Sequence, residues 1–235
     1  MKFIQPFKGY IFRIISSIIS DMKPNHATVT TWSSGAVTVD LLSYDMTRVL
    51  RFALGFTDGK PRRRRTYTIE GDGLAELFSY NGGGCVELRV EAGREAVLTV
   101  GSKSITLKPT SHNGLARVFT VDGWLWLSHY HVPLLHKYLQ LARGKEVKLS
   151  YNGRMLTVRY TGTYDEFCVR VPVDGVVRTR AEQAYSVTDT LVKVLTPRID
   201  WTTSIWFNKR HPVIIGRAAS VEFTLYYAQT PRVEG

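Results

Sequence analysis

Cysteine is scarce in this chain, which has only Cys85 and Cys168 among its 235 residues. Two cysteines allow one disulfide at most, so the dense disulfide framework of small secreted domains is excluded and a reducing, intracellular compartment is favoured. The cysteines and histidines also lack the paired spacing of a structural zinc site. We therefore expect an intracellular protein with no metal and no cofactor.

Signatures of common catalytic sites are lacking too. The sequence has no Gly-x-Ser-x-Gly elbow, no Gly-x-x-x-x-Gly-Lys phosphate loop and no His-Glu-x-x-His motif. His129, His131 and His136 are close in sequence but have no matched further ligand, so we interpret them as structural or solvated. Glu70 and Asp72 directly precede a predicted helix. Acidic groups at this position stabilise the N-terminus of a helix, so we interpret the two residues in this way. These absences predict a protein that is not an enzyme.

Long apolar runs are absent as well. Residues 1–22 resemble a signal peptide in part, because Lys2 precedes a segment rich in Ile and Phe. The apolar residues recur at helical spacing, however, and Arg13 interrupts them well before the roughly 20 residues that a membrane-spanning helix needs. The segment predicts a core helix over residues 7–22 with one wet, basic face, and no association with a membrane.

Positive charge is what the chain has in excess. Its formal net charge is +11 and its pI is about 9.7, which favours a polyanionic partner such as nucleic acid. A basic surface that only aids solubility is the alternative. The densest run is four arginines at residues 62–65, of which at most half would face one surface of a strand. We leave open whether this run is a solvated loop or a phosphate contact.

A helix followed by alternating strands recurs four times along the chain. Val37, Val39 and Leu41 show the two-residue period of a half-buried strand, and Asn152-Gly153 is typical of a hairpin turn. The four helices are predicted over residues 7–22, 73–80 (capped by Asp72), 133–143 and 187–195. This rhythm predicts an α+β fold of two similar domains, each a duplicated βαβββ unit with antiparallel strands and helices to one side.

Residues 109–117 break the strand rhythm with a polar segment that contains proline and glycine. Such composition is typical of a connection between domains. We expect an N-terminal domain over residues 1–108, this linker, and a C-terminal domain over residues 118–235.

Cations recur on the polar sides of three of the four predicted helices. Cationic helix faces without clusters of base-reading side chains suit contact with phosphates rather than sequence readout. The ordinary decoration of wet helices by Lys and Arg is the alternative. The candidate DNA-binding residues are Lys8, Arg13, Lys137, Arg143, Lys193 and Arg198.

The order of these segments resembles the sliding clamps of the proliferating cell nuclear antigen (PCNA) family over nearly the whole chain. Residues 35–49, Gly-Ala-Val-Thr-Val-Asp-Leu-Leu-Ser-Tyr-Asp-Met-Thr-Arg-Val, look like the family's strand and the loop that follows it. Residues 133–147 look like the helix and strand of its second domain. Residues 211–234 look like its last strand and its Pro-Lys/Arg-Ile-Glu tail, here Pro-Arg-Val-Glu.

The resemblance implies a DNA clamp fold in a closed ring, usually of three subunits, with sheets outside and helices on the inner face around double-stranded DNA. Such a ring is a homotrimer or a heterotrimer of related subunits, binds DNA without regard to sequence and has no catalytic activity. It tethers DNA polymerase, clamp loader, nuclease and ligase through short peptide motifs. These are our expectations for the partners of this chain.

The resemblance also implies two further sites. The partner-peptide pocket would use Tyr44, Val49, Leu115, Pro212, Ala228 and Pro231, and Arg51 stands where the family's pocket is apolar. Subunits would join through strands around residues 104–108 and 167–171, with Ile105, Leu107, Val169 and Val171 at the interface. Two alternatives to a closed clamp are a basic clamp-fold subunit that grips DNA without closing, and a metal-dependent nucleic-acid enzyme using Glu70, Asp72, Asp165 or the histidines.

Overall fold

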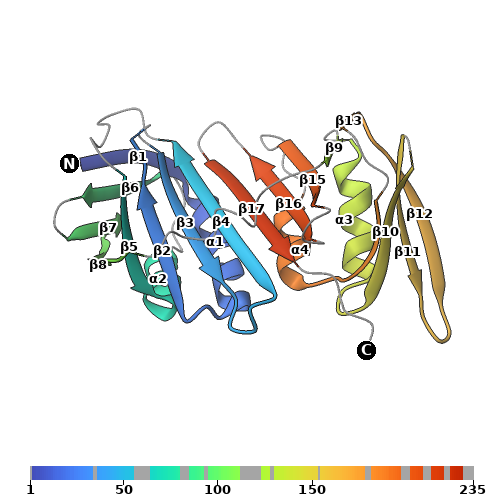
Figure 1. Cartoon of the computed structure of the whole chain (residues 1–235), viewed down its shortest axis with the longest axis horizontal. Helices are drawn as coiled ribbons and strands as arrows, with labels where there is room; N and C mark the ends of the chain where they lie inside the picture. The colour runs from blue at the N-terminus through green and yellow to red at the C-terminus, as the bar shows by residue number, and fades with distance from the viewer. Residues whose placement is uncertain are drawn as a thin grey trace. The chain divides into compact units, whose positions relative to one another are not determined.

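The computed structural model describes most of the chain as two compact units (Figure 1). The described residues are 2–33, 36–55, 64–79, 85–92, 95–111, 123–127, 130–152, 154–177, 181–196, 202–208, 213–219 and 223–229. Unit 1 comprises Met1–Ala116 with Glu222–Thr224, and unit 2 comprises Arg117–Val221 with Leu225–Gly235. Most of the predicted linker lies outside the described residues, so the domain boundaries stay a prediction.

Unit 1 contains two βαβββ halves that exchange their first strands. Its elements are β1 (Lys2–Lys8), α1 (Gly9–Met22), β2 (His26–Thr31), β3 (Ala36–Leu42), β4 (Arg48–Gly55), β5 (Arg65–Glu70), α2 (Gly71–Phe78), β6 (Cys85–Ala92), β7 (Ala96–Val100) and β8 (Lys103–Pro109). Strand β1 pairs with β6 and β5 pairs with β2, so the antiparallel orders are β1-β6-β7-β8 and β5-β2-β3-β4. Neither half completes its sheet without the other.

Unit 2 repeats the same exchange. Its elements are β9 (Gly123–Leu127), α3 (Val132–Leu141), β10 (Glu146–Asn152), β11 (Met155–Thr161), β12 (Glu166–Pro172), β13 (Gly175–Val177), β14 (Ala181–Ser186), α4 (Asp189–Val194), β15 (Thr202–Asn208), β16 (Val213–Ala219) and β17 (Phe223–Gln229). Here β14 pairs with β10 and β9 pairs with β15, giving the orders β12-β11-β10-β14 and β17-β16-β15-β9-β13. The predicted α+β fold with four βαβββ halves is confirmed.

The core of unit 1 lies between its helices and its sheets, and both helices lie on the same side of the strands in Figure 1. One face of α1 is buried, as its apolar spacing predicts. The Phe78 ring of α2 stacks on Phe12 of α1 at 5.7 Å between centroids and meets Phe52 of β4 edge-on at 5.3 Å. Val39 pairs with Phe52 and is also buried, so this row of the sheet faces the helices.

The predicted cap of the second helix is wrong. The helix begins at Gly71, not at 73; Glu70 is its N-cap residue without a side-chain bond, and Asp72 lies in its first turn. The reason is a close approach of two backbones: a Cβ on Gly71 would lie 1.7 Å from the carbonyl oxygen of Pro24, and the Gly71 N–H donates to the carbonyl of Asn25 at 3.0 Å. Only glycine fits this position.

Other element boundaries also differ from the sequence prediction. Helix α1 begins at Gly9 rather than 7, because β1 continues to pair with β6 as far as Lys8. Helix α4 begins at Asp189, after Thr188, whose hydroxyl accepts a hydrogen bond from the N–H of Leu191 at 3.2 Å. The strand predicted near residues 176–185 is two strands, β13 and β14. No helix in the described part of the chain is long and apolar enough to cross a membrane.

Candidate functional site

The helix surface of unit 1 carries mixed charge. Arg13 is exposed on α1, as predicted. Lys8 is the last residue of β1 and not part of the helix, and its side chain lies outside the described residues. Helix α2 contributes exposed acids, Asp72 and Glu76. This surface is therefore less basic than the sequence pattern around α1 indicates.

Three of the predicted DNA-binding residues lie on or just after the helices α3 and α4 of unit 2, which contact each other. Lys137 is exposed on α3, Lys193 is half-exposed on α4, and Arg143 follows the end of α3. Arg143 forms a two-pronged ion pair with Asp189 in the first turn of α4. The hydrogen bond from Arg143 holds the pKa of Asp189 below its usual value. Arg198 lies outside the described residues.

Helix α3 also presents an apolar stripe that the sequence reading missed. Leu134 and Leu141 are exposed before and after Lys137, at 36% and 60% of their surfaces, and Tyr130, two residues before the helix, is 76% exposed. The sequence does contain a signal for this stripe. Leu134 and Leu141 are seven residues apart, the spacing of two helical turns, and neither lies on the helix side that buries Leu135. The outer side of α3 is therefore amphipathic rather than purely cationic.

The loop between β3 and β4 exposes Tyr44, the first of the predicted pocket residues, to solvent. Tyr44 is 71% exposed, and so is its neighbour Met46, at 74%. Asp45 organises the loop by contacts with the Ser43 hydroxyl and the Thr47 N–H. Burial raises the pKa of Asp45, but the hydrogen bonds from Ser43 and Thr47 outweigh it, and the pKa lies below its usual value. The two exposed side chains thus stand on an ordered turn.

The other predicted pocket residues are buried or lie outside the described residues. Val49 is buried in β4 of unit 1, and Ala228 is buried in β17 within unit 2. Leu115, Pro212 and Pro231 lie outside the described residues. Sequence reasoning missed Met46, although it lies between Tyr44 and Val49.

The side chain of Arg51 forms an ion pair with Asp40 of the neighbouring strand in the same sheet. Its Nε donates to Asp40 Oδ1 at 2.5 Å and its Nη2 donates to Asp40 Oδ2 at 2.8 Å. The two residues lie directly opposite each other on β4 and β3, and their side chains are 14% and 3% exposed. The position that the resemblance assigns to an apolar pocket is thus occupied by one half of an internal ion pair.

The two strands predicted to join subunits, β8 and β12, differ in which side chains they offer. In the described sheet order β12 is a terminal strand, and β8 pairs with β5 only at Lys108 and Pro109. Ile105 and Val169 are half-buried on these strands. Leu107 and Val171 are fully buried inside their own units, so their side chains are unsuited to a subunit interface and only their strand backbones could serve it.

Two residues of the enzyme alternative, Asp165 and His131, are engaged in local contacts. Asp165 accepts hydrogen bonds from Lys145 at 3.0 Å and from Tyr160 at 3.1 Å. His131 Nδ1 lies 3.5 Å from Asp174 Oδ2. Among the described residues no group of three or more His, Cys, Asp or Glu side chains is arranged to hold a metal ion. His129 lies outside them.

The fold of the whole chain is shared by solved structures of PCNA chains. One, from A. fulgidus, is described as the C-terminal region of FEN-1 bound to PCNA; it has a TM-score of 0.74 and 13% identity, over 100% of this chain and 99% of that chain. The PCNA2–PCNA3 complex of Sulfolobus tokodaii gives a TM-score of 0.71 and 11% identity over the full length of both chains. No protein-family model and no curated protein matches the sequence.

Proposed function

We propose that this chain is a subunit of a DNA sliding clamp, which encircles duplex DNA and tethers DNA polymerase and other replication and repair enzymes. The observation that carries the proposal is the clamp fold itself, matched to PCNA chains from end to end in both directions. The net charge of +11 suits a polyanionic partner. The protein acts inside the cell as a non-catalytic scaffold.

The exposed faces of the helices contact the phosphates of the DNA. Lys137 and Lys193 lie on adjacent helices of unit 2, and Arg13 on α1 of unit 1. Backbone contacts of this kind position a protein on DNA but carry no sequence information. Arg143 contributes less, because Asp189 already balances its charge.

Subunits join by antiparallel pairing of β8 of one copy with β12 of the next. The two strands offer matching alternation: half-buried Ile105 and Val169 on one face, exposed Thr106 and Arg170 on the other. Each strand uses a different surface of the chain, so the contact is head-to-tail, the kind of contact that forms a ring when the rotation between successive copies closes. A homotrimer or a heterotrimer with related subunits satisfies this geometry.

Enzyme partners dock through short peptide motifs at the ordered loop that exposes Tyr44 and Met46. In the A. fulgidus structure the C-terminal region of FEN-1 is bound to the PCNA of that organism. Aromatic and methionine side chains are enriched in such contact surfaces. Because Arg51 is paired with Asp40, we expect its charge to contribute little to peptide binding.

The test combines native mass with retention on DNA. Light scattering is expected to give three times the 26.6 kDa of one chain, alone or with sister subunits. A closed ring loaded on circular DNA stays bound in salt and slides off once the circle is cut. Val169→Asp should abolish both the ring and retention, whereas Arg154→Ala, an exposed residue of the β10–β11 turn, should change neither.

A second candidate is a clamp-fold subunit that grips DNA directly without closing, which the charge of +11 favours. Such a protein would stay monomeric and bind short linear duplexes with a steep salt dependence. Retention that survives linearisation of the circle, together with a monomer mass, would replace the first proposal by this one.

A further inference from the structure

The two exposed leucines of α3 lie on the side of the helix that borders β12. Leu134, Tyr138 and Leu141 are spaced by four and three residues, so they share one side of α3. The ring of Tyr138 lies 5.9 Å from the ring of Phe167 on β12, centroid to centroid. The exposed leucines therefore belong to the edge of unit 2 that β12 forms in the described sheet order.

Strand β12 continues this apolar surface. Phe167 and Val169 are half-buried on the face of β12 that α3 covers. In the described sheet order, β12 pairs with β11 on one side and with no strand on the other. An apolar surface beside an unpaired strand edge is typical of an interface, because covering it satisfies the backbone and buries the side chains. We call this the joint surface: Leu134, Tyr138, Leu141, Phe167 and Val169.

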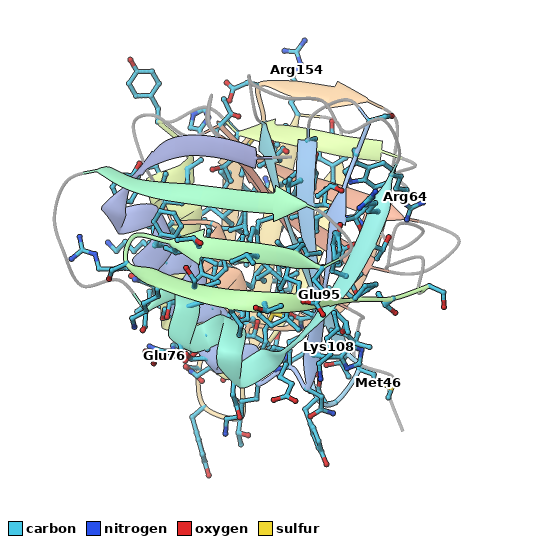
Figure 2. The ribbon with its side chains drawn as sticks, turned by 90° about the vertical axis from the view of Figure 1, so that its left-hand side faces the viewer. Met46, Arg64, Glu76, Glu95, Lys108 and Arg154 are labelled. Atoms are coloured by element: carbon cyan, nitrogen blue, oxygen red, sulfur yellow. The ribbon has the colours of Figure 1, made fainter. Side chains whose placement is uncertain are left out.

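The β8 edge of unit 1 has the complementary shape. Within the described residues, β8 pairs with β7 alone over residues 103–107. Helix α2 approaches β8 so closely that a Cβ on Gly73 would lie 2.9 Å from Ile105 Cδ1. In Figure 2, α2 with Glu76 lies beside β8, and Lys108 lies near the far end of that strand. This edge is therefore shallow at Gly73, whereas the edge of unit 2 carries projecting leucines.

The helices at the two edges also carry opposite charge. Helix α2 contains exposed Asp72 and Glu76 and no lysine or arginine. Helix α3 contains exposed Lys137, one turn from each leucine, and no acid. Contact of α3 with a second α3 would bring two copies of Lys137 together, and contact of α2 with a second α2 would gather acids. Contact of α2 with α3 joins unlike charges, so the two edges of one chain complement each other.

We propose that the joint surface binds the β8–α2 edge of a second copy of this chain, so that the ring consists of identical subunits. The proposal rests on the head-to-tail contact of the proposed clamp and names its partner. When β8 pairs with β12 and the covered faces of both strands lie on the same side, α2 and α3 meet side by side. Gly73 and Ile105 then cover the joint surface, and Asp72 approaches Lys137. One chain carries both halves of the contact, so no sister subunit is needed.

The first measurement is the native mass of the purified chain, without DNA or other proteins. Light scattering should give three times the 26.6 kDa of one chain. Leu134→Ser/Leu141→Ser should reduce the mass to that of one chain. Gln140→Ser is the matched control on α3, because this exposed residue is two positions from Tyr138 and so lies on another side of the helix. Circular dichroism checks that the variants are folded.

The second measurement tests the charges at the contact. Asp72→Lys and Lys137→Asp each place like charges at every joint, so each should weaken subunit association about tenfold. The combined variant Asp72→Lys/Lys137→Asp restores unlike charges and should associate almost as the wild type does. Asp72 is chosen because Glu76 is already paired with Lys103. The mass is measured without DNA, since Lys137 is also a candidate phosphate contact.

The outcomes separate this inference from the proposed function. A chain that is monomeric alone but forms a ring with sister subunits would overturn the inference and leave the clamp intact. A monomer under all conditions, with DNA retention that survives linearisation of the circle, would overturn both. A mass of two chains would show that the joint surface binds its own copy, contrary to the inference. An unchanged mass in the leucine variant, or no recovery in the combined charge variant, would also overturn it.

Discussion

The guanidinium of Arg51 and the carboxylate of Asp40 form a two-pronged pair across β4 and β3, with Asp40 almost fully buried. A buried pair of this kind gains little over an apolar pair, but the loss of one partner leaves an uncompensated charge. The pair therefore fixes the register of β3 against β4 more than it adds net stability.

Arg51→Ala should lower the free energy of unfolding by about 3 kcal/mol, because the Asp40 carboxylate stays buried without its partner. Urea denaturation measures this change. Arg48→Ala is the matched control on the same strand: Arg48 meets exposed Asp45 at 3.5 Å, and surface pairs are worth about 1 kcal/mol or less. The double variant Asp40→Leu/Arg51→Leu should be more stable than Arg51→Ala. Equal costs for Arg51→Ala and Arg48→Ala would show that the pair has no special role.

The existence of the four helices and the alternation of the strands could be predicted, because each depends on local periodicity. The exchange of β1 and β5 between the halves could not, since partner choice among similar strands is decided by long-range packing. The start of α2 at Gly71 depends in the same way on Pro24, which is distant in sequence.

The candidate site shows the same division. The exposure of Arg13, Lys137 and Tyr44 follows from pattern and resemblance. The pairing of Arg143 with Asp189, 46 residues further on, has no local signal. That pairing links two helices through a residue that is predicted to contact phosphate.

Lys103 closes the C-terminal end of α2, and its replacement should loosen that helix. Its ammonium donates to the Glu76 carbonyl at 3.1 Å, to Ser79 Oγ at 2.8 Å and to the Glu76 carboxylate at 2.6 Å. A cation at a helix C-terminus also interacts favourably with the helix dipole. Lys103→Met should lower the melting temperature by a few degrees and speed amide hydrogen exchange in α2. Lys103→Arg keeps the positive charge, so its melting temperature and its amide protection should stay close to those of the wild type.

The same contact predicts an acid dependence. The hydrogen bond from Lys103, followed by its charge, holds the pKa of Glu76 below its usual value. The contribution to stability is therefore complete above the pKa of the unfolded chain and is lost as the pH falls through the folded pKa. Melting curves recorded from neutral to acid pH should show a smaller loss in Lys103→Met than in the wild type. An unchanged acid slope would rule out this contribution.

Lys145, Tyr160 and Asp165 hold the tip of the β11–β12 hairpin, and the ion pair acts at both ends of the pH range. The hydrogen bond with Asp165 raises the pKa of Lys145, and the same bond lowers the pKa of Asp165. The Asp165 contribution is lost as the pH falls through its folded pKa, and the Lys145 contribution is lost as the pH rises through its own. Asp165→Asn should flatten both limbs of the profile of melting temperature against pH.

Tyr160→Phe is the control for that variant, because it removes one hydrogen bond to Asp165 but keeps the ring 4.4 Å from the Lys145 ammonium. It should weaken the alkaline limb only in part, because Asp165 is the larger cause of the raised pKa of Lys145 and the Tyr160 hydroxyl the second. Gly162→Ala should behave more like Asp165→Asn, since a Cβ there would lie 2.2 Å from the Tyr160 hydroxyl and 2.5 Å from Asp165 Oδ1. A wild-type profile in Asp165→Asn would contradict the assignment.

Gln229 at the end of β17 points inward and anchors α4. Its Oε1 accepts hydrogen bonds from the Tyr227 hydroxyl at 2.9 Å and from the Thr188 hydroxyl at 3.2 Å, and Thr188 also caps α4 through the N–H of Leu191. Tyr227 and Gln229 are both buried. Gln229→Leu removes a shared acceptor from two partly or fully buried hydroxyls, whose oxygens lie 2.9 Å apart.

We expect Gln229→Leu to lower the free energy of unfolding by about 1–2 kcal/mol, measured by urea denaturation. Gln140→Leu, an exposed glutamine on α3, should change it by about 0.5 kcal/mol or less. In Tyr227→Phe, the further effect of Gln229→Leu should shrink, because one of the two donors is already gone. Strictly additive effects would mean that the hydroxyls do not depend on Gln229. The predicted coupling would instead make this glutamine the acceptor that joins the last strand to the capped start of α4.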